Sequence, residues 1–432
     1  MAIERSDATL YRGYRTELDP TRSQLELLRK FGGTARWTYN WGLQRKIEAY
    51  RAAGVVPTRF DLEKELVRLK RDDSPWLKEI SKCVPQEALK DLEAAFQNFY
   101  RSLRGGRTCG FPRFKARRKS GTCFRIGGEA LKITTTHIWL ARIGWVRLKE
   151  RGYLPTSEVH YVAVTVRERA DKWFVGVTVG RPMPAVALHS GPSAGLDVGL
   201  LHLATLSDGT VYDSPRSLRR FDRRLRHADR ALSRKQPGSR NWNRARLQLA
   251  RLHLRVANIR LDANHKITTE VTRAKSLIVI EDFQTANLKR NKRVSRAFHD
   301  AAISQFLRQL PYKSQWRGGS VQVAPQFFPS TRMCSACGWI NKSMSLAERT
   351  YRCDRCGLTI DRDINAAKNL HALAASPADS HACREDVSPY LVAVLDEAGT
   401  ADYGGGRSPC LSVAIPMTGR RARTAISHVT AA

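Results

Sequence analysis

The sequence predicts a multidomain α/β protein in which strand-rich and helix-rich segments follow one another. Apolar and polar residues alternate with a period of two within 130–180, which is typical of an antiparallel sheet. Apolar residues recur every three or four positions over 85–103 and along most of 216–275, which predicts amphipathic helices. A chain of 432 residues is long enough for two or three such domains.

The first half of the chain combines short strands with helices. Residues 6–19 predict a short strand, and the alternating segments within 130–180 predict further strands with a turn near Ala170 and Asp171. A helical pattern that starts at Thr21 separates these strand regions. We therefore expect a small antiparallel sheet or barrel that carries a helical insert.

Strands and helices alternate in the second half. After a strand around GLDVG, residues 216–275 predict two basic helices separated at 237–241. The apolar segment 276–282 predicts a buried strand, 295–317 a helix, and 320–325 another strand. This alternation favours a domain built on a sheet with covering helices.

Linker composition and changes of pattern predict the domain boundaries. The stretch 181–193 contains Pro, Gly and Ser and marks the main boundary. The last part of the chain is near neutral, with five arginines, six acidic residues and much Ala, Ser and Gly, which predicts disorder or dispensability. The expected organisation is a lobe at 1–190 with a helical insert at about 21–110, a second domain starting with 191–326, an insert at 327–360, its last element at 361–374, and the tail at 375–432.

The charge of the chain predicts a polyanionic partner. Lys and Arg number 74 against 40 Asp and Glu, a formal net charge of +34, which favours nucleic acid over a membrane surface. No apolar run approaches the ~18 residues of a membrane span, and the first residues lack a signal-peptide pattern. The chain has nine cysteines, four of them in two close pairs and five scattered, and an odd number with wide spacing does not predict a disulfide framework. We expect a cytoplasmic protein without membrane contact.

Basic residues alternate with aromatic ones over 104–125, around Phe111 and Phe114, which suits phosphate contacts combined with base stacking. A solvated basic loop is the alternative. Between Arg216 and Arg260 the chain carries fifteen Lys and Arg but only two acidic residues. The candidate nucleic-acid contacts are Arg113, Lys115, Arg117, Arg118, Arg244, Arg246 and Arg251, although each of them could simply face solvent.

Four cysteines have the spacing of a zinc site. Cys334, Cys337, Cys353 and Cys356 form the pattern C-x2-C-x15-C-x2-C, and a glycine follows each pair. Four thiolates fill the tetrahedral positions of Zn²⁺, which predicts a structural rather than a catalytic metal. The alternative is a ribbon that folds without metal.

Three acidic residues predict a second metal site. Asp197 lies in the GLDVG strand, Glu281 ends the strand SLIVIE, and Asp363 opens the helix DINAAKNL. A carboxylate in an apolar strand is costly to bury unless it is paired or binds a cation. Carboxylates that converge at one sheet edge can hold two Mg²⁺ ions for phosphodiester cleavage. The order strand–Asp, strand–Glu, helix–Asp describes an RNase H-like catalytic core.

Two neighbouring acids compete for these roles. Asp361 lies two residues before Asp363, and either of them could be only a helix cap. Asp282 follows Glu281, and adjacent strand residues point to opposite faces, so only one of the two can face the metals. The residues alone leave both choices open.

The chain resembles the TnpB (OrfB) family of insertion-sequence proteins, which is related to the compact type V CRISPR effectors. The resemblance extends over roughly residues 10–372. It is carried by TARWTYNWGL, GFPRFKARRKS, GLDVGLLHLATLSDG, LSRKQPGSRNWNRARLQLARLH, VIEDF, and FFPSTRMCSACG through DRDINAAKNL. The last three blocks and the GLDVG block are specific in combination.

The resemblance implies the site and its partners. The three RuvC-like acids of the family fall on Asp197, Glu281 and Asp363. Family membership implies a guide RNA copied from the transposon end, a short DNA motif recognised beside the target, and cleavage of the DNA. The expected partners are the guide RNA and double-stranded and single-stranded DNA. It also implies that the strands of 1–20 and 122–190 form a barrel that grips the RNA and that the helices of 21–110 read the duplex.

These observations together predict an RNA-guided, Mg²⁺-dependent DNA endonuclease, with a RuvC-like core, an inserted zinc ribbon and an N-terminal barrel. Two other functions remain open. An RNase H-like core also serves transposases that act without a guide, and a guided protein without cleavage would act as a repressor. The sequence does not predict an oligomeric state.

Overall fold

The computed structural model describes residues 9–104, 110–117, 121–128, 131–182, 187–283, 295–345 and 348–374. These residues form two compact units. The smaller unit comprises the described residues of 22–126 with 141–143, and the larger unit those of 9–21, 127–140 and 144–374. The tail predicted at 375–432 lies outside the described residues. In the described part of the chain, no helix is both long and apolar enough to cross a membrane.

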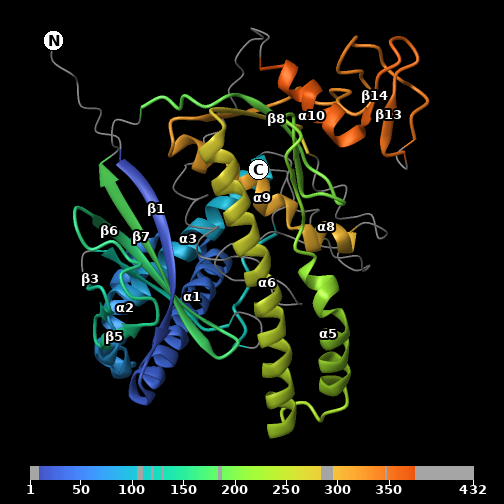
Figure 1. Cartoon of the computed structure of the whole chain (residues 1–432). Coiled ribbons are helices and arrows are strands. Elements are labelled where there is room, and N and C mark those ends of the chain that lie inside the picture. The colour runs from blue at the N-terminus through green and yellow to red at the C-terminus, as the bar shows by residue number, and fades with distance from the viewer. Residues whose placement is uncertain are drawn as a thin grey trace, which may run out of the picture. The chain divides into compact units, whose positions relative to one another are not determined.

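The smaller unit is helical. It contains α1 (Arg22–Ala53), α2 (Arg59–Asp72), the 3-10 helix η1 (Pro75–Glu79) and α3 (Cys83–Arg104) (Figure 1). Helix α2 begins at a capping box, in which Thr58 and Asp61 each accept a backbone hydrogen bond from the other. A Cβ at Gly42 would lie 2.8 Å from Leu89, so glycine allows α1 to pack closely on α3. The predicted helices that start at 21 and span 85–103 are confirmed.

An antiparallel sheet follows in the larger unit, where β1 (Thr9–Asp19) pairs with β7 (Lys172–Pro182). Within this unit the strand order is β6-β7-β1-β5-β4-β3. Its other strands are β3 (Lys132–Ile133), β4 (His137–Leu140), β5 (Gly144–Leu148) and β6 (His160–Arg169). The strand β2 (Cys123–Gly127) has all but its last residue in the smaller unit. Among the described residues of this unit, β6 and β3 are not paired with each other, so closure into a barrel stays a prediction.

The turns and lengths of this sheet follow from particular residues. Ala170 and Asp171 have φ values of 50° and 66° and join β6 to β7, as a two-residue hairpin turn requires. The turn predicted there is confirmed. The strand predicted at 6–19 as short is eleven residues long over its described part, because Leu10–Leu18 pair continuously with β7.

The second sheet of the larger unit is mixed. Its order is β10-β9-β8-β11-β12, with β8 (Ala194–Asp197), β11 (Leu277–Ile280) and β12 (Ser320–Val323) parallel. The antiparallel strands β9 (Ala204–Leu206) and β10 (Val211–Tyr212) complete it. Its core includes Leu196, Ile278, Phe306 and Leu310, which are all buried. This mixed sheet with covering helices supports the predicted RNase H-like core.

Two long helices between β10 and β11 form an antiparallel pair. They are α5 (Ser217–Ser233) and α6 (Arg240–Ala274), which lie side by side (Figure 1). Phe221, Leu225 and Val256 are buried between them. Ser239 is the N-cap of α6, and its side chain accepts a hydrogen bond from the Trp242 amide. Both predicted basic helices are confirmed.

The single helix predicted at 295–317 is wrong. The chain forms α8 (Ser295–Ala301) and α9 (Ile303–Gln315), because Ala302 between them adopts a left-handed φ of 54°. A left-handed residue cannot continue a right-handed helix. Phe298 on α8 and Phe306 on α9 are both buried in the core of the mixed sheet, so packing favours the break.

The last elements are a small ribbon and a helix. The ribbon strands β13 (Thr350–Arg352) and β14 (Thr359–Asp361) are antiparallel, and α10 (Arg362–Ala372) follows directly. Helix α10 packs on β8, where a Cβ at Gly195 would lie 2.0 Å from the carbonyl oxygen of Ala367 and 2.4 Å from the amide nitrogen of His371. Only a residue without a side chain fits at this position.

We expect Gly195→Ala to destabilise the larger unit by about 1–3 kcal/mol, the usual cost of overpacking a core. The added methyl group meets the backbone of α10, which cannot give way as a flexible side chain can. Gly33→Ala is the matched control, since nothing lies within 4 Å of the place its methyl group would take and the helix gains a better helix former. Thermal and denaturant unfolding would measure both; equal stability of the Gly195 variant and the native protein would contradict the close packing.

Candidate metal centre and active site

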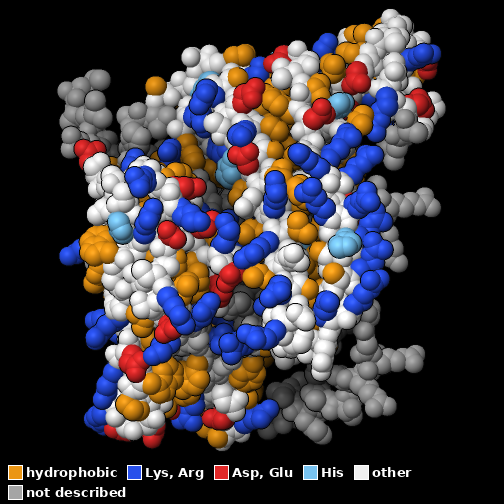
Figure 2. Space-filling view, turned by 60° about the horizontal axis from the view of Figure 1, so that its bottom comes forward, with side chains coloured by type: hydrophobic (Ala, Val, Ile, Leu, Met, Phe, Trp, Pro, Cys, Tyr) orange, Lys and Arg blue, Asp and Glu red, His pale blue; other side chains and the backbone are white. Residues whose placement is uncertain are grey.

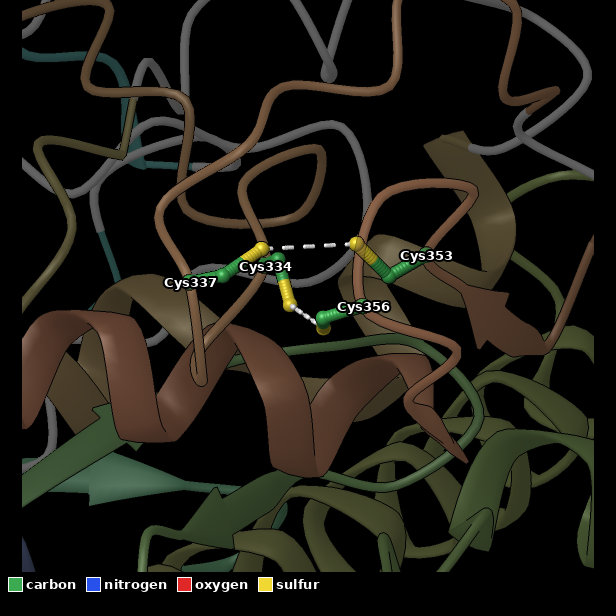
Figure 3. Close-up of side chains that lie close together, drawn as sticks. All are labelled: Cys334, Cys337, Cys353 and Cys356. Carbon is green, nitrogen blue, oxygen red and sulfur yellow. Dashed lines mark hydrogen bonds between the residues drawn. The ribbon is translucent and has the colours of Figure 1, made fainter.

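The four predicted zinc ligands come together. The sulfur atoms of Cys334, Cys337, Cys353 and Cys356 all lie within 4.8 Å of one another (Figure 3). Cys334 and Cys356 are 3.6 Å apart, and Cys337 and Cys353 are 3.5 Å apart. A tetrahedral ion with Zn–S bonds of about 2.3 Å separates its sulfurs by about 3.8 Å. The geometry therefore fits a zinc site.

Both cysteine pairs lie on the same kind of turn. Gly338 donates a hydrogen bond from its amide to the carbonyl of Cys334, and Gly357 does the same to Cys353. The φ values of the two glycines are 72° and 75°, in the left-handed region that favours glycine. Although desolvation opposes it, hydrogen bonds from the Cys356 and Arg355 amides lower the pKa of the Cys353 thiol to about 7. These amides thus favour the thiolate form of Cys353, the form that binds metal. Against a hydrogen bond from the Leu358 amide, the neighbouring Cys337 and Cys353 thiols raise the pKa of Cys356 to about 12, so that thiol gives up its proton only when a metal replaces the thiol–thiol contacts.

Two buried asparagines connect the first cysteine turn to α10. The Asn365 side chain accepts a hydrogen bond from the Ser335 amide (3.0 Å) and donates to the Met333 carbonyl (2.7 Å). Asn369 donates to the carbonyls of Ser330 and Met333. Sequence reasoning missed both asparagines, and the signal that could have found them is two asparagines four residues apart on one helix face.

Asp197 and Glu281 lie at neighbouring strand ends. Asp197 is the last residue of β8, and Glu281 directly follows β11. These strands are parallel, and Leu196 is paired with Ile280, so the two acids continue the same register. Carboxyl ends of parallel strands meet at one sheet edge. Asp197 is 8% exposed and Glu281 is half-buried.

Asp363 joins these two acids from α10. It is 8% exposed, and its charge acts on Asp197. Burial raises the pKa of Asp197 to about 7, and the carboxylates of Asp363 and Glu281 add to the increase. Burial, followed by the charge of Asp282, also raises the pKa of Glu281. Negative charge that Arg362 offsets only in part gathers here, which is the condition that a bound cation relieves.

The competing acids lie differently. Asp361 is the N-cap of α10, and its carboxylate accepts hydrogen bonds from the amides of Asp363 (2.9 Å) and Ile364 (3.1 Å). It therefore has the capping role that was the alternative for this pair. The charges that raise the pKa of Asp197 come from Asp363 and Glu281, which favours these two acids over Asp361 and Asp282.

The ligand atoms of the three carboxylates are less tightly clustered than the four sulfur atoms. Among the residues that the structure describes, only the four cysteines place three or more metal-ligand atoms within 4.8 Å of one another. Arginines occupy part of the space beside Asp363, whose Oδ1 lies 3.5 Å from Arg362 Nε and 3.9 Å from Arg349 Nη1. The oxygen donors have the chemistry that Mg²⁺ prefers, and two metals about 3.5–4 Å apart do not require one compact set.

The candidate nucleic-acid contacts are mostly exposed. Arg113 and Arg117 are exposed, and Arg118 lies outside the described residues. Lys115 is half-buried: its backbone exchanges two hydrogen bonds with the Asn40 side chain, and its Nζ lies 3.7 Å from the centre of the Tyr39 ring. This cation–π contact gives Lys115 a packing role in the smaller unit.

The three candidates on α6 face solvent. Arg244, Arg246 and Arg251 are all exposed, and Arg251 lies 3.5 Å from Asp171. Lys and Arg side chains outnumber Asp and Glu over the face drawn in Figure 2. The structure does not bring these three arginines into one pocket, so their contacts with nucleic acid stay predictions.

We expect Cys334→Ser to lose most of its metal, because a hydroxyl group replaces one of four thiolate ligands. Protein purified without chelator should contain about one zinc per chain by elemental analysis, and the variant far less. Cys83→Ser is the control, since Cys83 lies in α3, outside the cysteine cluster. Native protein that folds without any zinc would show that the ribbon does not need metal.

We expect Asp197→Asn to stabilise the protein at pH 8 in Mg²⁺-free buffer with zinc retained. Asp197 has a pKa of about 7 when folded, and an aspartate in an unfolded chain one of about 3.9. Between about pH 4 and pH 7 the folded state therefore binds one more proton than the unfolded state does. The free energy of unfolding of the native protein falls as the pH rises through this range. The gain from asparagine should reach a few kcal/mol at pH 8, since each pKa unit is about 1.4 kcal/mol.

The same comparison contains its own controls. Near pH 4 the advantage of Asp197→Asn should vanish, because the native carboxyl group is then neutral. Asp213→Asn changes an exposed aspartate that pairs with His202 and should give no such pH-dependent gain. Thermal unfolding across this pH range measures both variants, and equal melting of Asp197→Asn and native protein at pH 8 would contradict the buried charge cluster.

Three segments of the chain match family models. Residues 176–292 match the OrfB_IS605 model, described as "Probable transposase", and residues 304–370 match the "Cas12f1-like, TNB domain". Residues 10–54 match the "Helix-turn-helix domain" of OrfB_IS605. In this structure residues 10–54 fold as most of β1 and the single long helix α1.

Whole-length relatives give the family. The chain is 33% identical over 377 residues to the "Putative RNA-guided DNA endonuclease InsQ" of Escherichia coli (strain K12), covering 83% of this chain and 91% of that protein. It is 33% identical over 389 residues to the "Putative RNA-guided DNA endonuclease" of Streptomyces pristinaespiralis, covering 88% and 92%. The solved "Structure of the mini-RNA-guided endonuclease CRISPR-Cas_phi3" aligns at 11% identity and a TM-score of 0.44, covering 90% of this chain and 93% of that one. Because the sequence relatives are similar over most of both chains, this protein belongs to the TnpB (OrfB) family.

Proposed function

We propose that the protein is an RNA-guided, Mg²⁺-dependent DNA endonuclease associated with an insertion sequence. One observation carries the catalytic part of this proposal. Asp197 is buried at the end of β8 while the charges of Glu281 and Asp363 raise its pKa further. Buried like charges of this kind are costly for stability and are typical of sites that bind cations.

The three carboxylates would hold the catalytic metal, with two Mg²⁺ ions as the proposed number. Bound Mg²⁺ supplies activation of the attacking water and stabilisation of the leaving oxygen. Asp197 is buried on a rigid strand and fixes the centre of the site, while Glu281 and Asp363 approach it from β11 and α10. Cys334 and its three partners hold a structural zinc, because four thiolates leave no position open for substrate.

Guide RNA and target DNA are the proposed partners. The relatives named above are called RNA-guided DNA endonucleases, and this chain matches them over most of its length. Its net charge of +34 suits phosphate backbones. In guided nucleases, base pairing supplies the sequence specificity while the protein contacts the backbone. Cleavage beside a short DNA motif and the RNA-binding role of the β1–β7 sheet rest on the family resemblance.

A guide-independent transposase is the second candidate, because the model that matches 176–292 is described as "Probable transposase". Co-purifying RNA distinguishes the two functions. A guided nuclease should carry one discrete RNA, and DNA complementary to that RNA should be cut in the presence of Mg²⁺. A guided repressor is less well supported, since all three acids are present and their charges are coupled.

We expect Glu281→Gln and Asp363→Asn each to lower the rate of DNA cleavage by more than about 100-fold, because each removes a proposed ligand of the catalytic metal. Their neighbours provide matched controls. Asp282→Asn should keep most of the activity, and Asp361→Asn should as well, because asparagine caps helices as well as aspartate does. Single-turnover cleavage of guide-matched DNA measures the rates, and binding of the same DNA should remain.

The opposite ranking would refute the site assignment. If Asp361→Asn or Asp282→Asn abolished cleavage while the neighbouring variants cut normally, the metal ligands would be the other acids. Zinc content and melting temperature should be determined for all four variants, so that a folding defect is not mistaken for a loss of catalysis.

A further inference from the structure

An arginine-lined pocket lies beside the proposed active site. Its volume is about 480 Å³, and four arginines from three separate segments line it: Arg216, Arg219, Arg296 and Arg349. All four are exposed. Leu200 and Leu201, which also line the pocket, follow Asp197 by three and four residues. The pocket is within the range of about 300–1,000 Å³ of small-ligand sites.

The charge of this pocket is positive. Asp300 is its only acidic lining residue, and it is buried and already engaged. Its carboxylate caps α5, accepting hydrogen bonds from the amides of Leu218 (2.6 Å) and Arg219 (3.0 Å). Arg296 pairs with Asp222. Among the described residues, no carboxylate forms an ion pair with Arg216 or Arg219, so their charges are available to a ligand.

Arg349 connects the pocket to the acidic site. It lines the pocket, and its Nη1 lies 3.9 Å from Asp363 Oδ1. The ribbon holds its backbone in place, because Thr350 pairs with Asp361 and the Arg349 carbonyl accepts a hydrogen bond from the Arg362 amide (2.8 Å). Its side chain can therefore reach a group in the pocket while the backbone stays fixed beside Asp363.

Arg216 lines the pocket from the residue just before α5. Its backbone has a left-handed φ of 43°, an uncommon conformation for a residue with a side chain. Its guanidinium group donates a hydrogen bond to the Leu201 carbonyl (3.1 Å), on the loop that follows Asp197. Strained backbone of this kind is found preferentially at ligand-binding sites. Residues that line the pocket thus include Leu201, on the loop that follows Asp197, and Arg349, which contacts Asp363 at the start of α10.

We infer that this pocket binds a phosphate of the DNA strand being cut, close to the scissile bond, and that Arg349 is a positioning residue for that strand. The inference rests on the proposed function. Guanidinium groups match phosphate oxygens as paired donors, and the apolar wall of Leu200 and Leu201 suits the sugar. Arg349 exchanges its contact with Asp363 for the phosphate, which leaves that carboxylate available to a cation.

The test combines arginine variants with a neutral backbone. A methylphosphonate, which carries no charge, replaces one phosphate at a time on either side of the cut in guide-matched DNA. In the native protein–RNA complex, at least one position should slow single-turnover cleavage by about 10- to 100-fold, the effect of losing one charged contact. Arg349→Ala should slow cleavage of unmodified DNA similarly, and the methylphosphonate at that position should then have no further effect.

Arg352→Ala is the matched control, since Arg352 is exposed on β13 in the same ribbon but does not line the pocket. It should cleave within about twofold of native protein and keep the full methylphosphonate effect. Arg349→Lys should recover part of the rate, because it restores the charge without the paired donors. If Arg349→Ala loses zinc or stability, the same comparison of unmodified and methylphosphonate DNA is made with Arg219→Ala, because Arg219 lines the pocket from α5.

Additive effects of Arg349→Ala and methylphosphonate at every position would overturn the inference, and so would native cleavage by both Arg349→Ala and Arg219→Ala. Failure of the proposed function gives a different result, because native protein would then cut no DNA at all. In that case the pocket is judged from binding of single-stranded oligonucleotides by fluorescence anisotropy. Equal affinities of native protein and Arg349→Ala would overturn it, and affinity at least tenfold weaker for the variant would support it.

Discussion

The close packing of α10 on β8 at Gly195 is the contact on which the rest of the site depends. No side chain fits between this strand and the helix, so the acid at the start of α10 is held beside the acid at the end of β8. The other face of α10 carries Asn365 and Asn369, which bind the backbone of the first cysteine turn. One helix therefore connects the sheet, the carboxylates and the ribbon.

This arrangement gives the ribbon a physical role near the active site. The cysteine turns set the geometry of β13 and β14, and the end of that hairpin carries both Arg349 and the start of α10. Negative charge is concentrated at the carboxylates, while the adjacent pocket is positive. A cation and a phosphate can therefore be bound side by side, and each reduces the electrostatic cost of the other.

Local sequence patterns predicted the cysteine cluster and many of the strands and helices. The spacing of the cysteines predicted the cluster, and the glycine after each pair has the left-handed φ that its turn requires. Period-two and helical patterns predicted the sheet strands, α3 and the basic pair α5 and α6. Patterns failed where distant packing decided the outcome. The break at Ala302 within a continuous apolar pattern lets two helices reach the same core.

Residue type and spacing alone predicted the four sulfur ligands, since a pair of cysteines on one tight turn needs only its own few residues to present two thiolates. Residue type and spacing left the choice among the acids open, although the family resemblance pointed to Asp363. Asp361 and Asp363 are two residues apart, and in the folded chain Asp361 caps α10 while the charge of Asp363 acts on Asp197. Burial and charge coupling depend on neighbours that are far away in the sequence. For the same reason, the arginine pocket, assembled from three separate segments, appears only in the folded protein.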